Sequence, residues 1–450
     1  MKIHLIATGG SAMHNMAIAL HLKGYQVTGS DDEIFEPSKG RLKKYGLLPD
    51  AIGWNPDKIT SDLDAVILGM HAREDNPELL KAQELGLNIY SYPEYIFNQS
   101  EDKKRIVIGG SHGKTSITAM ILHVLNALDF KYDYMIGAQL EGFECMVKLS
   151  HDAPIIILEG DEYLSSPIDR RPKFHLYKAH TAVISGIAWD HINVFPTFEN
   201  YVDQFQIFTD QIEKGGKLIY CESDEEVKSI GEKHVGDSIA YSTHDHKIVN
   251  GKTILLDDGV EYPISVFGGH NLQNLNAALN VAIDLGISKQ QFYKAIANFT
   301  GASKRLELVK ETKSSAVYKD FAHSPSKLKA TSKAMKDQFE NRSLVACMEL
   351  HTFSSLNEDF LKQYEGCMDA PDTAYVFFSP KALAHKKLPS ISAEQVHNAF
   401  GRKDLQVFTS SEEFVKELKT KDWNNQNLLL MSSGNFEGVD FNELATSLIG

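Results

Sequence analysis

A glycine-rich loop between an apolar run and a helical pattern constrains this sequence more than any other feature. The stretch GGSHGKTSITAM, residues 109–120, follows the apolar run RIVI and leads into the apolar-periodic segment ITAMILHVLNAL. In a phosphate loop, glycines let backbone N–H groups close around phosphate oxygens, a Lys reaches the outer phosphates, and a Ser or Thr hydroxyl binds Mg²⁺. Gly113, Lys114 and Thr115 supply that ending. The loop therefore predicts a nucleotide-phosphate site.

The first position of this loop departs from the usual spacing. The first glycine of a phosphate loop would fall at Ile108, and Gly109 and Gly110 follow one and two residues later. A GKT tripeptide can occur by chance in a glycine-rich turn, but a strand that enters and a helix that leaves are the context that confirms the motif. We therefore interpret it as a shortened variant.

Apolar runs and amphipathic stretches alternate along the whole chain, which predicts an α/β fold of parallel sheets with right-handed crossovers. With 450 residues, the chain is too long for one compact core. The polar stretch at 98–105 ends a first α/β segment, and the alternation restarts after GASKRLELV. We expect three domains, at residues 1–101, 102–306 and 307–450.

Composition excludes several classes of function. The net charge of −14 argues against a nucleic-acid or anionic-membrane surface, since both need clustered Lys and Arg. Cys145, Cys221, Cys347 and Cys367 are scattered without a CxxC pair, so we expect buried free thiols and a reducing compartment. The N-terminal apolar run is too short for a secretory signal, and no run approaches the ~18 apolar residues of a spanning helix. We expect a cytoplasmic protein.

Carboxylates follow two of the apolar runs. IILEGDEY places Glu159, Asp161 and Glu162 at the end of an apolar run, where open α/β sheets bind ligands, and VISGIAWDH ends in Asp190 and His191. Carboxylates there suit Mg²⁺, which prefers oxygen ligands. A solvated acidic turn and a structural His are the alternatives.

Polar residues farther along the chain are candidates for nucleotide contacts. Asn271 and Asn274 share a helical face, where an amide can read an adenine edge or cap the helix. Arg305 could reach a phosphate that bears developing charge, or be a solvated surface residue. Asp320 and His323 follow another apolar run, as a ribose contact or a turn.

The N-terminal stretch ATGGSAM lacks the glycines of a GxGxxG dinucleotide fingerprint. Ser30 and Asp31 end the second predicted strand, where they could bind a ribose hydroxyl or form a polar turn. This first segment alone would suit a nicotinamide dehydrogenase, which should bind NAD and ignore ATP. The second glycine-rich loop makes that class the least favoured.

Taken together and in order, six stretches resemble the Mur ligase family, ATP-dependent ligases that build the peptide stem of peptidoglycan. The stretches are GGSHGKTS, EGDEY, WDH, GGHNLQNLNAA, SKRLE and KDFAHSP. The resemblance covers essentially the whole chain. It implies a Rossmann-like N-terminal domain that binds a nucleotide sugar, a central ATPase domain and a Rossmann-like C-terminal domain, with closure on the substrates through hinges near 98–105 and 302–306.

The resemblance also implies roles for particular residues. Lys114, Glu159, His191 and Arg305 are the implied catalytic residues, and Thr115, Glu159 and His191 would hold Mg²⁺. The implied ATP contacts are Ser111, His112, Gly113, Lys114, Thr115, Ser116, His270, Asn271, Asn274, Arg305 and Asp320. The implied contacts to the sugar nucleotide and acceptor are Thr8, Gly9, Gly10, Ser11, Ser30, Asp31, His71 and His323.

Within the family, the N-terminal loop resembles the branch that uses UDP-N-acetylmuramate. GSDDEIFEPS, DRRPKFHLYKAHTAVISGIAWDH and MSSGNFEG resemble the enzymes that attach a murein tripeptide, whereas MELHTFSS resembles the enzymes that add L-alanine. Ala7 and Ala12 stand where the family usually has glycine, and an added methyl at a close backbone approach takes room from a pyrophosphate.

The expected reaction activates the muramate carboxylate as an acyl phosphate, which an amine then attacks. We expect ATP, Mg²⁺ and small-molecule substrates as partners, and the sequence gives no oligomeric state. A P-loop kinase that stops at phosphoryl transfer, and a nucleotide-binding regulator without turnover, are the alternatives. A kinase would form a stable phosphorylated product without amine, and intact Lys114, Glu159 and His191 argue against the regulator.

Overall fold

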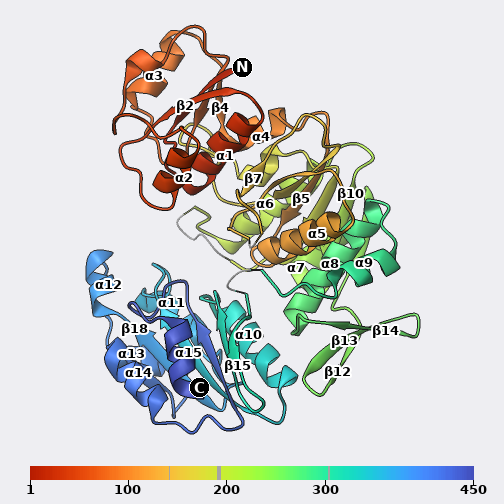
Figure 1. Cartoon of the computed structure of the whole chain (residues 1–450), viewed down its shortest axis with the longest axis vertical. Coiled ribbons are helices and arrows are strands. Elements are labelled where there is room, and N and C mark those ends of the chain that lie inside the picture. The colour runs from red at the N-terminus through yellow and green to blue at the C-terminus, as the bar shows by residue number, and fades with distance from the viewer. Residues whose placement is uncertain (141, 190–193, 303–304) are drawn as a thin grey trace. The chain divides into compact units, whose positions relative to one another are not determined.

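The structure is a computed structural model that describes residues 1–140, 142–189, 194–302 and 305–450. These residues form two compact units: Met1–Ser242 with Gln273–Ala295, and Thr243–Leu272 with Ile296–Gly450. Three sheets built mainly of parallel strands follow one another along the chain (Figure 1). The α/β class with three parallel-sheet domains is confirmed, and the boundaries at 101/102 and 306/307 stay a prediction.

The N-terminal sheet has four parallel strands in the order β2-β1-β3-β4. Its elements are β1 (Lys2–Ile6), α1 (Ser11–Leu22), β2 (Gln26–Ser30), α2 (Ser38–Lys44), β3 (Ala65–Leu68), α3 (Pro77–Glu84), β4 (Ile89–Ser91) and α4 (Tyr92–Asn98). Local sequence sets where the later helices begin. Asn76 caps α3 ahead of Pro77, and Ser91 with Glu94 forms a reciprocal capping box at α4.

The central sheet has seven strands in the order β11-β10-β9-β5-β8-β6-β7, and only β7 runs antiparallel to its neighbour. Its strands are β5 (Lys104–Gly109), β6 (Asp133–Met135), β7 (Val147–Lys148), β8 (Ile155–Glu159), β9 (Thr181–Ile184), β10 (Lys217–Cys221) and β11 (Asp237–Tyr241). Its helices are α5 (Lys114–Ala127), α6 (Phe198–Asp210) and α7 (Glu225–Lys233), and α8 (Gly269–Asp284) and α9 (Lys289–Ile296) follow later in the chain.

β5 lies between β8 and β9, and the chain leaves it toward one side of the sheet and returns on the other. Such a reversal of strand order opens a crevice at the carboxyl ends of the strands, where open α/β sheets bind ligands. The phosphate loop and the EGDEY stretch therefore meet at one edge of the central sheet.

The second unit contains a small antiparallel sheet and the C-terminal sheet. The small sheet has the order β12-β13-β14, with strands β12 (His246–Val249), β13 (Lys252–Asp257) and β14 (Val260–Ile264). The C-terminal sheet has the order β15-β16-β20-β17-β18-β19, with only β15 antiparallel. Its strands are β15 (Glu307–Glu311), β16 (Ala316–Asp320), β17 (Ser343–Leu350), β18 (Thr373–Phe378), β19 (Gln406–Phe408) and β20 (Gln426–Met431).

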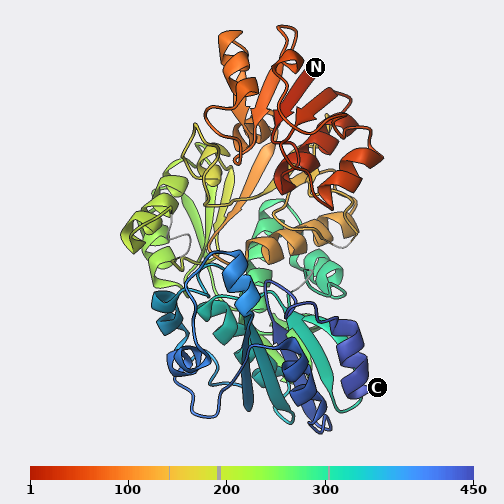
Figure 2. The ribbon, with the colours of Figure 1, turned by 90° about the vertical axis from the view of Figure 1, so that its left-hand side faces the viewer.

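Helices cover both faces of the C-terminal sheet (Figure 2). They are α10 (Pro325–Gln338), α11 (Glu358–Leu361), α12 (Pro380–His385), α13 (Ala393–Phe400), α14 (Ser411–Lys419) and α15 (Phe441–Ile449). Short 3₁₀ helices elsewhere are η1 (Pro56–Lys58), η2 (Lys173–Leu176) and η3 (Lys362–Tyr364). Alternate residues of β17 pack into opposite cores, Leu344 and Ala346 into one and Val345 and Cys347 into the other. Burial on both faces explains the continuous apolar run that predicted this strand.

No helix in the described parts of the chain is long and apolar enough to cross a membrane. The cysteines Cys145, Cys221, Cys347 and Cys367 are free and buried, as their scattered positions predicted.

A carboxylate that is 10% exposed joins the amino ends of three central strands. Asp284, the last residue of α8, lies 2.7 Å from Lys104 Nζ and 2.9 Å from Lys217 Nζ, and accepts a 2.7 Å hydrogen bond from Thr181 Oγ1. Burial acts to raise the pKa of Asp284, but the hydrogen bonds from Lys104, Thr181 and Lys217 outweigh it and lower the pKa. The carboxylate therefore stabilises the fold in its charged form.

Replacing Asp284 by Asn should lower the free energy of unfolding by about 2 kcal/mol at pH 7. A depressed pKa gives stability that is fully present above the unfolded-state value of about 3.9 and is lost as the pH falls through the lower folded value. Denaturant unfolding from pH 7 to 3 should therefore show the two proteins converging below about pH 4. Asp237→Asn is the control, because that exposed carboxylate lies 3.4 Å from Lys217 and should change little. A difference for Asp284→Asn that stays constant with pH would contradict this account.

Candidate active site

The loop between β5 and α5 needs glycine at two positions. Gly110 has φ 132° and Gly113 has φ 83°, backbone conformations that side chains rarely adopt. A Cβ on Gly110 would stand 2.1 Å from Ser185 Oγ, and one on Gly113 would stand 2.5 Å from Asn274 Oδ1. The later glycines of the motif therefore carry the tight backbone path.

The segment after β9 holds this loop from beside it. Ser111 N donates to Gly186 O at 2.9 Å, and the Ser185 hydroxyl donates to the carbonyl of His112. Ala188 N in turn donates to Ser111 Oγ at 2.9 Å. These hydrogen bonds join the loop to the segment after β9.

Gly110→Ala should raise KM for ATP at least tenfold, which corresponds to about 1.4 kcal/mol of lost binding. The added methyl must displace Ser185 or the loop, because 2.1 Å is far inside van der Waals contact. Steady-state kinetics with varied ATP would measure the change. Gly24→Ala is the matched control, since Gly24 also has a positive φ of 95° but no atom lies within 4 Å of its Cβ position. An unchanged KM in Gly110→Ala would contradict this role of the loop.

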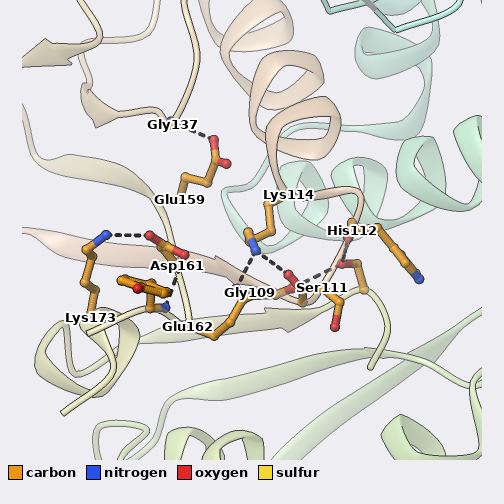
Figure 3. A network of polar contacts seen from close by, with 12 residues as sticks. Gly109, Ser111, His112, Lys114, Gly137, Glu159, Asp161, Glu162 and Lys173 are labelled. Atoms are coloured by element: carbon orange, nitrogen blue, oxygen red, sulfur yellow. Dashed lines mark hydrogen bonds and ion pairs between the residues drawn. The ribbon is translucent and has the colours of Figure 1, made fainter. Parts of the chain in front are cut away.

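Lys114, the first residue of α5, points back across the loop mouth (Figure 3). Its Nζ lies 2.5 Å from Glu162 Oε2 and donates to Gly110 O at 2.6 Å. Burial acts to lower the pKa of Lys114, but the charges of Glu162 and Asp161 outweigh it, so the pKa lies above its usual value. The ammonium is therefore charged and placed where a Lys of a phosphate loop meets outer phosphates.

Glu162 is held in place by a second contact. Its side chain is 1% exposed, and Tyr201 donates its hydroxyl proton to Glu162 Oε1 at 3.1 Å. The hydroxyls of Tyr201 and Ser111 lie 2.8 Å apart. Tyr201, from α6, thus links the acidic strand end to the phosphate loop.

Glu159, the last residue of β8, faces the start of α5 (Figure 3). It accepts hydrogen bonds from Thr115 Oγ1 at 2.9 Å and from Gly137 N at 2.8 Å. Burial raises the pKa of Glu159. The Thr115 hydroxyl and the Glu159 carboxylate form a pair of oxygen donors beside the loop, a set that fits Mg²⁺, which is bound by one or two carboxylates together with substrate phosphates.

Asp161 forms a separate ion pair with Lys173, whose Nζ lies 2.5 Å from Asp161 Oδ2. Burial acts to raise the pKa of Asp161, but Lys173 and Lys114 outweigh it and lower the pKa to about 2. No cluster of three or more His, Cys, Asp or Glu side chains suited to a metal occurs among the described residues. Asp190 and His191 lie outside those residues, so the implied His191 ligand stays a prediction.

Two of the implied adenine contacts, Asn271 and Asn274, lie at the start of α8. Asn274 is buried against Gly113, as its distance to a Cβ there shows. Asn271 donates from Nδ2 to the carbonyl of Phe267 at 2.9 Å, a bond to the backbone four residues earlier. This bond is not a helix cap, in which the side-chain oxygen would accept from a backbone N–H, and the implied adenine contact of Asn271 stays a prediction. His270 precedes it as the second residue of α8.

In the second unit, Asp320 fastens the backbone where the third predicted domain begins. Its two oxygens accept hydrogen bonds from Leu306 N and Ala322 N, both at 2.6 Å. Arg305 lies over the ring of Phe321, with 4.8 Å from Cζ to the ring centroid, and His323 Nδ1 donates to Phe321 O at 2.7 Å. Asp320 thus serves the backbone here, and its implied role toward ATP stays a prediction.

The N-terminal loop is tied to the end of β2. Asp31 Oδ2 accepts a 2.6 Å hydrogen bond from Gly9 N, and Thr8 N donates to Ser30 O at 3.1 Å. Burial raises the pKa of Asp31. The carboxylate expected near a ribose therefore holds the loop itself. Gly10 and Ser11 begin α1, and His71 lies exposed in the turn after β3.

Ala7 adopts φ 66°, in the left-handed region that favours glycine. An alanine at this position, where the family usually has glycine, therefore takes up space and also strains the backbone by about 1–2 kcal/mol. Ala12 is exposed in the first turn of α1.

Residues that the sequence did not single out complete the site. Lys173, Tyr201, Ser185 and Gly137 lie in other elements and contact the loop or the acidic strand end. Lys173 and Ser185 fall within stretches quoted for the family resemblance but were not proposed as site residues, and the pairing of β5 with β8 and β9 and of β6 with β8 brings these segments together. The site thus gathers a phosphate loop, an ammonium and an oxygen donor pair at one sheet edge.

Family comparisons agree with this geometry. Residues 2–102 match the model of the Mur ligase family catalytic domain, and residues 108–282 match the Mur ligase middle domain. The UDP-N-acetylmuramate–L-alanine ligase of Sulfurihydrogenibium sp. is 31% identical over 387 residues, which cover 83% of this chain and 82% of that protein.

Among solved structures, the UDP-N-acetylmuramate–alanine ligase of Thermotoga maritima is similar with a TM-score of 0.70 and 21% identity, covering 97% of this chain and 96% of that one. The murein peptide ligase of Psychrobacter arcticus is similar with a TM-score of 0.64 and 22% identity, covering 100% and 98%. At these identities the likeness shows a shared three-domain fold.

Proposed function

Because the chain belongs to the Mur ligase family and is therefore an ATP-dependent amide ligase, we propose that it joins UDP-N-acetylmuramate to a murein tripeptide. The observation that supports this most is the sheet edge that combines Lys114 with the Thr115–Glu159 pair. That arrangement neutralises charge during phosphoryl transfer to a carboxylate. We also propose that the reaction takes place in the cytoplasm.

The proposed reaction has two steps. A carboxylate oxygen of the sugar nucleotide attacks the γ-phosphorus of ATP, the bond to the β-phosphate oxygen breaks, and ADP leaves. The acceptor amine then attacks the acyl carbon, a C–N bond forms, and inorganic phosphate leaves with the electrons of the C–O bond. Forming the acyl phosphate first replaces a carboxylate oxygen, which is a poor leaving group, with phosphate, which is a good one.

Residues of this chain hold the groups that react. Lys114 binds the transferring phosphate, and the glycine-rich loop that ends at Gly113 surrounds it. Thr115 and Glu159, with His191 by family resemblance, would hold Mg²⁺, which when bound supplies positive charge beside the phosphates. Arg305 would stabilise the transferring group, and the N-terminal loop would hold the sugar nucleotide.

L-Alanine is the second candidate acceptor, because the Sulfurihydrogenibium relative is an L-alanine ligase. Three sequence stretches favour the tripeptide, and MELHTFSS favours L-alanine. The deciding experiment supplies ATP, Mg²⁺ and UDP-N-acetylmuramate with either L-alanine or L-alanyl-γ-D-glutamyl-meso-diaminopimelate, and measures phosphate release.

We expect the tripeptide to give the larger kcat/KM, with little release when the sugar nucleotide is omitted. A wide preference for L-alanine would contradict the proposed acceptor. Absence of release with both acceptors, in folded protein that binds ATP, would contradict the proposed pair of substrates.

A further inference from the structure

A buried carboxylate and a half-exposed imidazole lie together at the carboxyl edge of the C-terminal sheet. Glu349, near the end of β17, is 2% exposed. Its Oε2 accepts a 2.8 Å hydrogen bond from Phe436 N and a second bond from the Ser432 hydroxyl, both from the segment after β20. Glu349 is therefore fixed in position by its partners.

His351 follows directly after β17 and faces this carboxylate. Its Nδ1 lies 3.5 Å from Glu349 Oε1, and its side chain is 39% exposed. A Cβ on Gly434 would stand 3.1 Å from Cγ and Nδ1 of the ring, so the backbone of that loop packs against the imidazole. None of the described residues forms a hydrogen bond with His351 Nε2.

This geometry selects one tautomer of His351. A carboxylate beside Nδ1 favours the proton on that nitrogen and leaves a lone pair on Nε2. A carboxylate that orients an imidazole while the far nitrogen stays open is the arrangement of a general base with its positioning group. The 3.5 Å separation is longer than a hydrogen bond, as is common for catalytic contacts before the substrates bind.

The proposed reaction needs such a base, because an amine with an ordinary pKa is mostly protonated at neutral pH and only its uncharged form attacks. We propose that His351 Nε2 accepts a proton from the ammonium group of the acceptor, which frees the amine to attack the acyl carbon, with Glu349 as the positioning residue. That proton passes to solvent from the exposed side of the ring, and the proton that the nitrogen loses after the C–N bond forms leaves with the departing phosphate. This inference rests on the proposed function, since it assigns the base of its second step.

Hydroxylamine separates this role from others. It is uncharged near neutral pH, so it intercepts an acyl phosphate without prior removal of a proton and yields a stable hydroxamate. In the full-length protein with ATP, Mg²⁺ and UDP-N-acetylmuramate, His351→Asn should lower amide formation about 10²-fold or more. Hydroxamate formation should stay within about twofold of the wild type, because hydroxylamine reaches the acyl phosphate already uncharged and does not need the base.

Two further variants sharpen the test. Glu349→Gln can keep the bonds from Ser432 and Phe436 through its amide oxygen, but its NH₂ group would face Nδ1 and favour the tautomer with the proton on Nε2. It should therefore resemble His351→Asn in both assays. His397→Asn, in α13 of the same sheet domain, is the matched control and should leave both rates unchanged.

The outcomes distinguish the inference from its premise. Equal loss of amide and hydroxamate in His351→Asn, with an unchanged unfolding transition, would place His351 in an earlier step and overturn the proposal. Unchanged amide formation would overturn it as well. If the wild type gave no hydroxamate, the acyl phosphate itself would be absent, and the proposed function would fail together with the inference.

Discussion

Lys114→Ala should lower ATP-dependent phosphate release at least about 10³-fold, the largest effect that we expect from one substitution. The ammonium is the cation of the loop mouth, and it carries a full charge because its pKa is raised by Glu162 and Asp161 against the opposite effect of burial. Removing it leaves the charge that spreads over the transferring phosphate without its partner from α5.

The structure adds a consequence for stability. Without Lys114, the carboxylate of Glu162 stays 1% exposed and loses this ion pair, while the Tyr201 hydroxyl still donates to it. Removing one partner of a buried ion pair destabilises a protein by about 3–5 kcal/mol. Lys114→Ala should therefore unfold at lower denaturant concentration, and Lys114→Ala with Glu162→Gln should recover much of that loss without recovering turnover.

This design separates catalysis from folding. Lys173→Ala is the matched control, since it removes a neighbouring ammonium that pairs with the more exposed Asp161, and it should keep most of the turnover. Phosphate release and urea unfolding would be measured on all four proteins. Turnover that returned in the double variant would show that Lys114 acts only as the partner of Glu162.

Glu159→Gln should lower the activity at saturating ATP about 10²-fold or more, while its free energy of unfolding stays the same or rises. Burial raises the pKa of Glu159, so the charged carboxylate is disfavoured in the folded protein and its removal relieves that cost. The Gln oxygen can accept the bond from Gly137 N, while its NH₂ group can donate to the hydroxyl oxygen of Thr115. Function and stability should therefore change in opposite directions, which a folding defect would not produce.

The same raised pKa predicts how the wild type depends on pH and Mg²⁺. A carboxylate binds a divalent cation only when it is ionised. As the pH falls, Glu159 should take up its proton at a higher pH than an ordinary Glu, so the Mg²⁺ concentration for half-maximal phosphate release should rise there. The pKa of Asp161 is held at about 2, so protonation of Asp161 itself should not contribute to this profile. A Mg²⁺ requirement independent of pH in the wild type would contradict the metal role of Glu159.

Local pattern was enough to predict the α/β class and the strand-loop-helix at the phosphate loop. Continuous apolar runs such as IIIL in β8 and LVACMEL in β17 mark strands that are buried on both faces. The glycines at 110 and 113 could be assigned to a turn because only glycine adopts their backbone angles readily.

Contacts between distant segments could not be predicted in the same way. The Lys114–Glu162 and Glu159–Gly137 contacts join residues 48 and 22 positions apart, and they exist because β5, β8 and β6 pair in one sheet. The sequence likewise did not reveal that Asp31 accepts a hydrogen bond from Gly9 N or that Asp320 accepts one from Leu306 N. A carboxylate after a strand looks the same in sequence whether it binds a ligand or a backbone N–H. Side-chain partners follow from strand order, which motifs do not encode.

The Lys114–Glu162 pair also bears on how the reaction ends. Any anion in the loop competes with a carboxylate that is part of the chain and therefore present at a fixed high local concentration. A nucleotide overcomes this competitor through its many other contacts, whereas free inorganic phosphate has few. As phosphate departs, Glu162 can take back the ammonium, so the chain carries a group that competes with the product for Lys114.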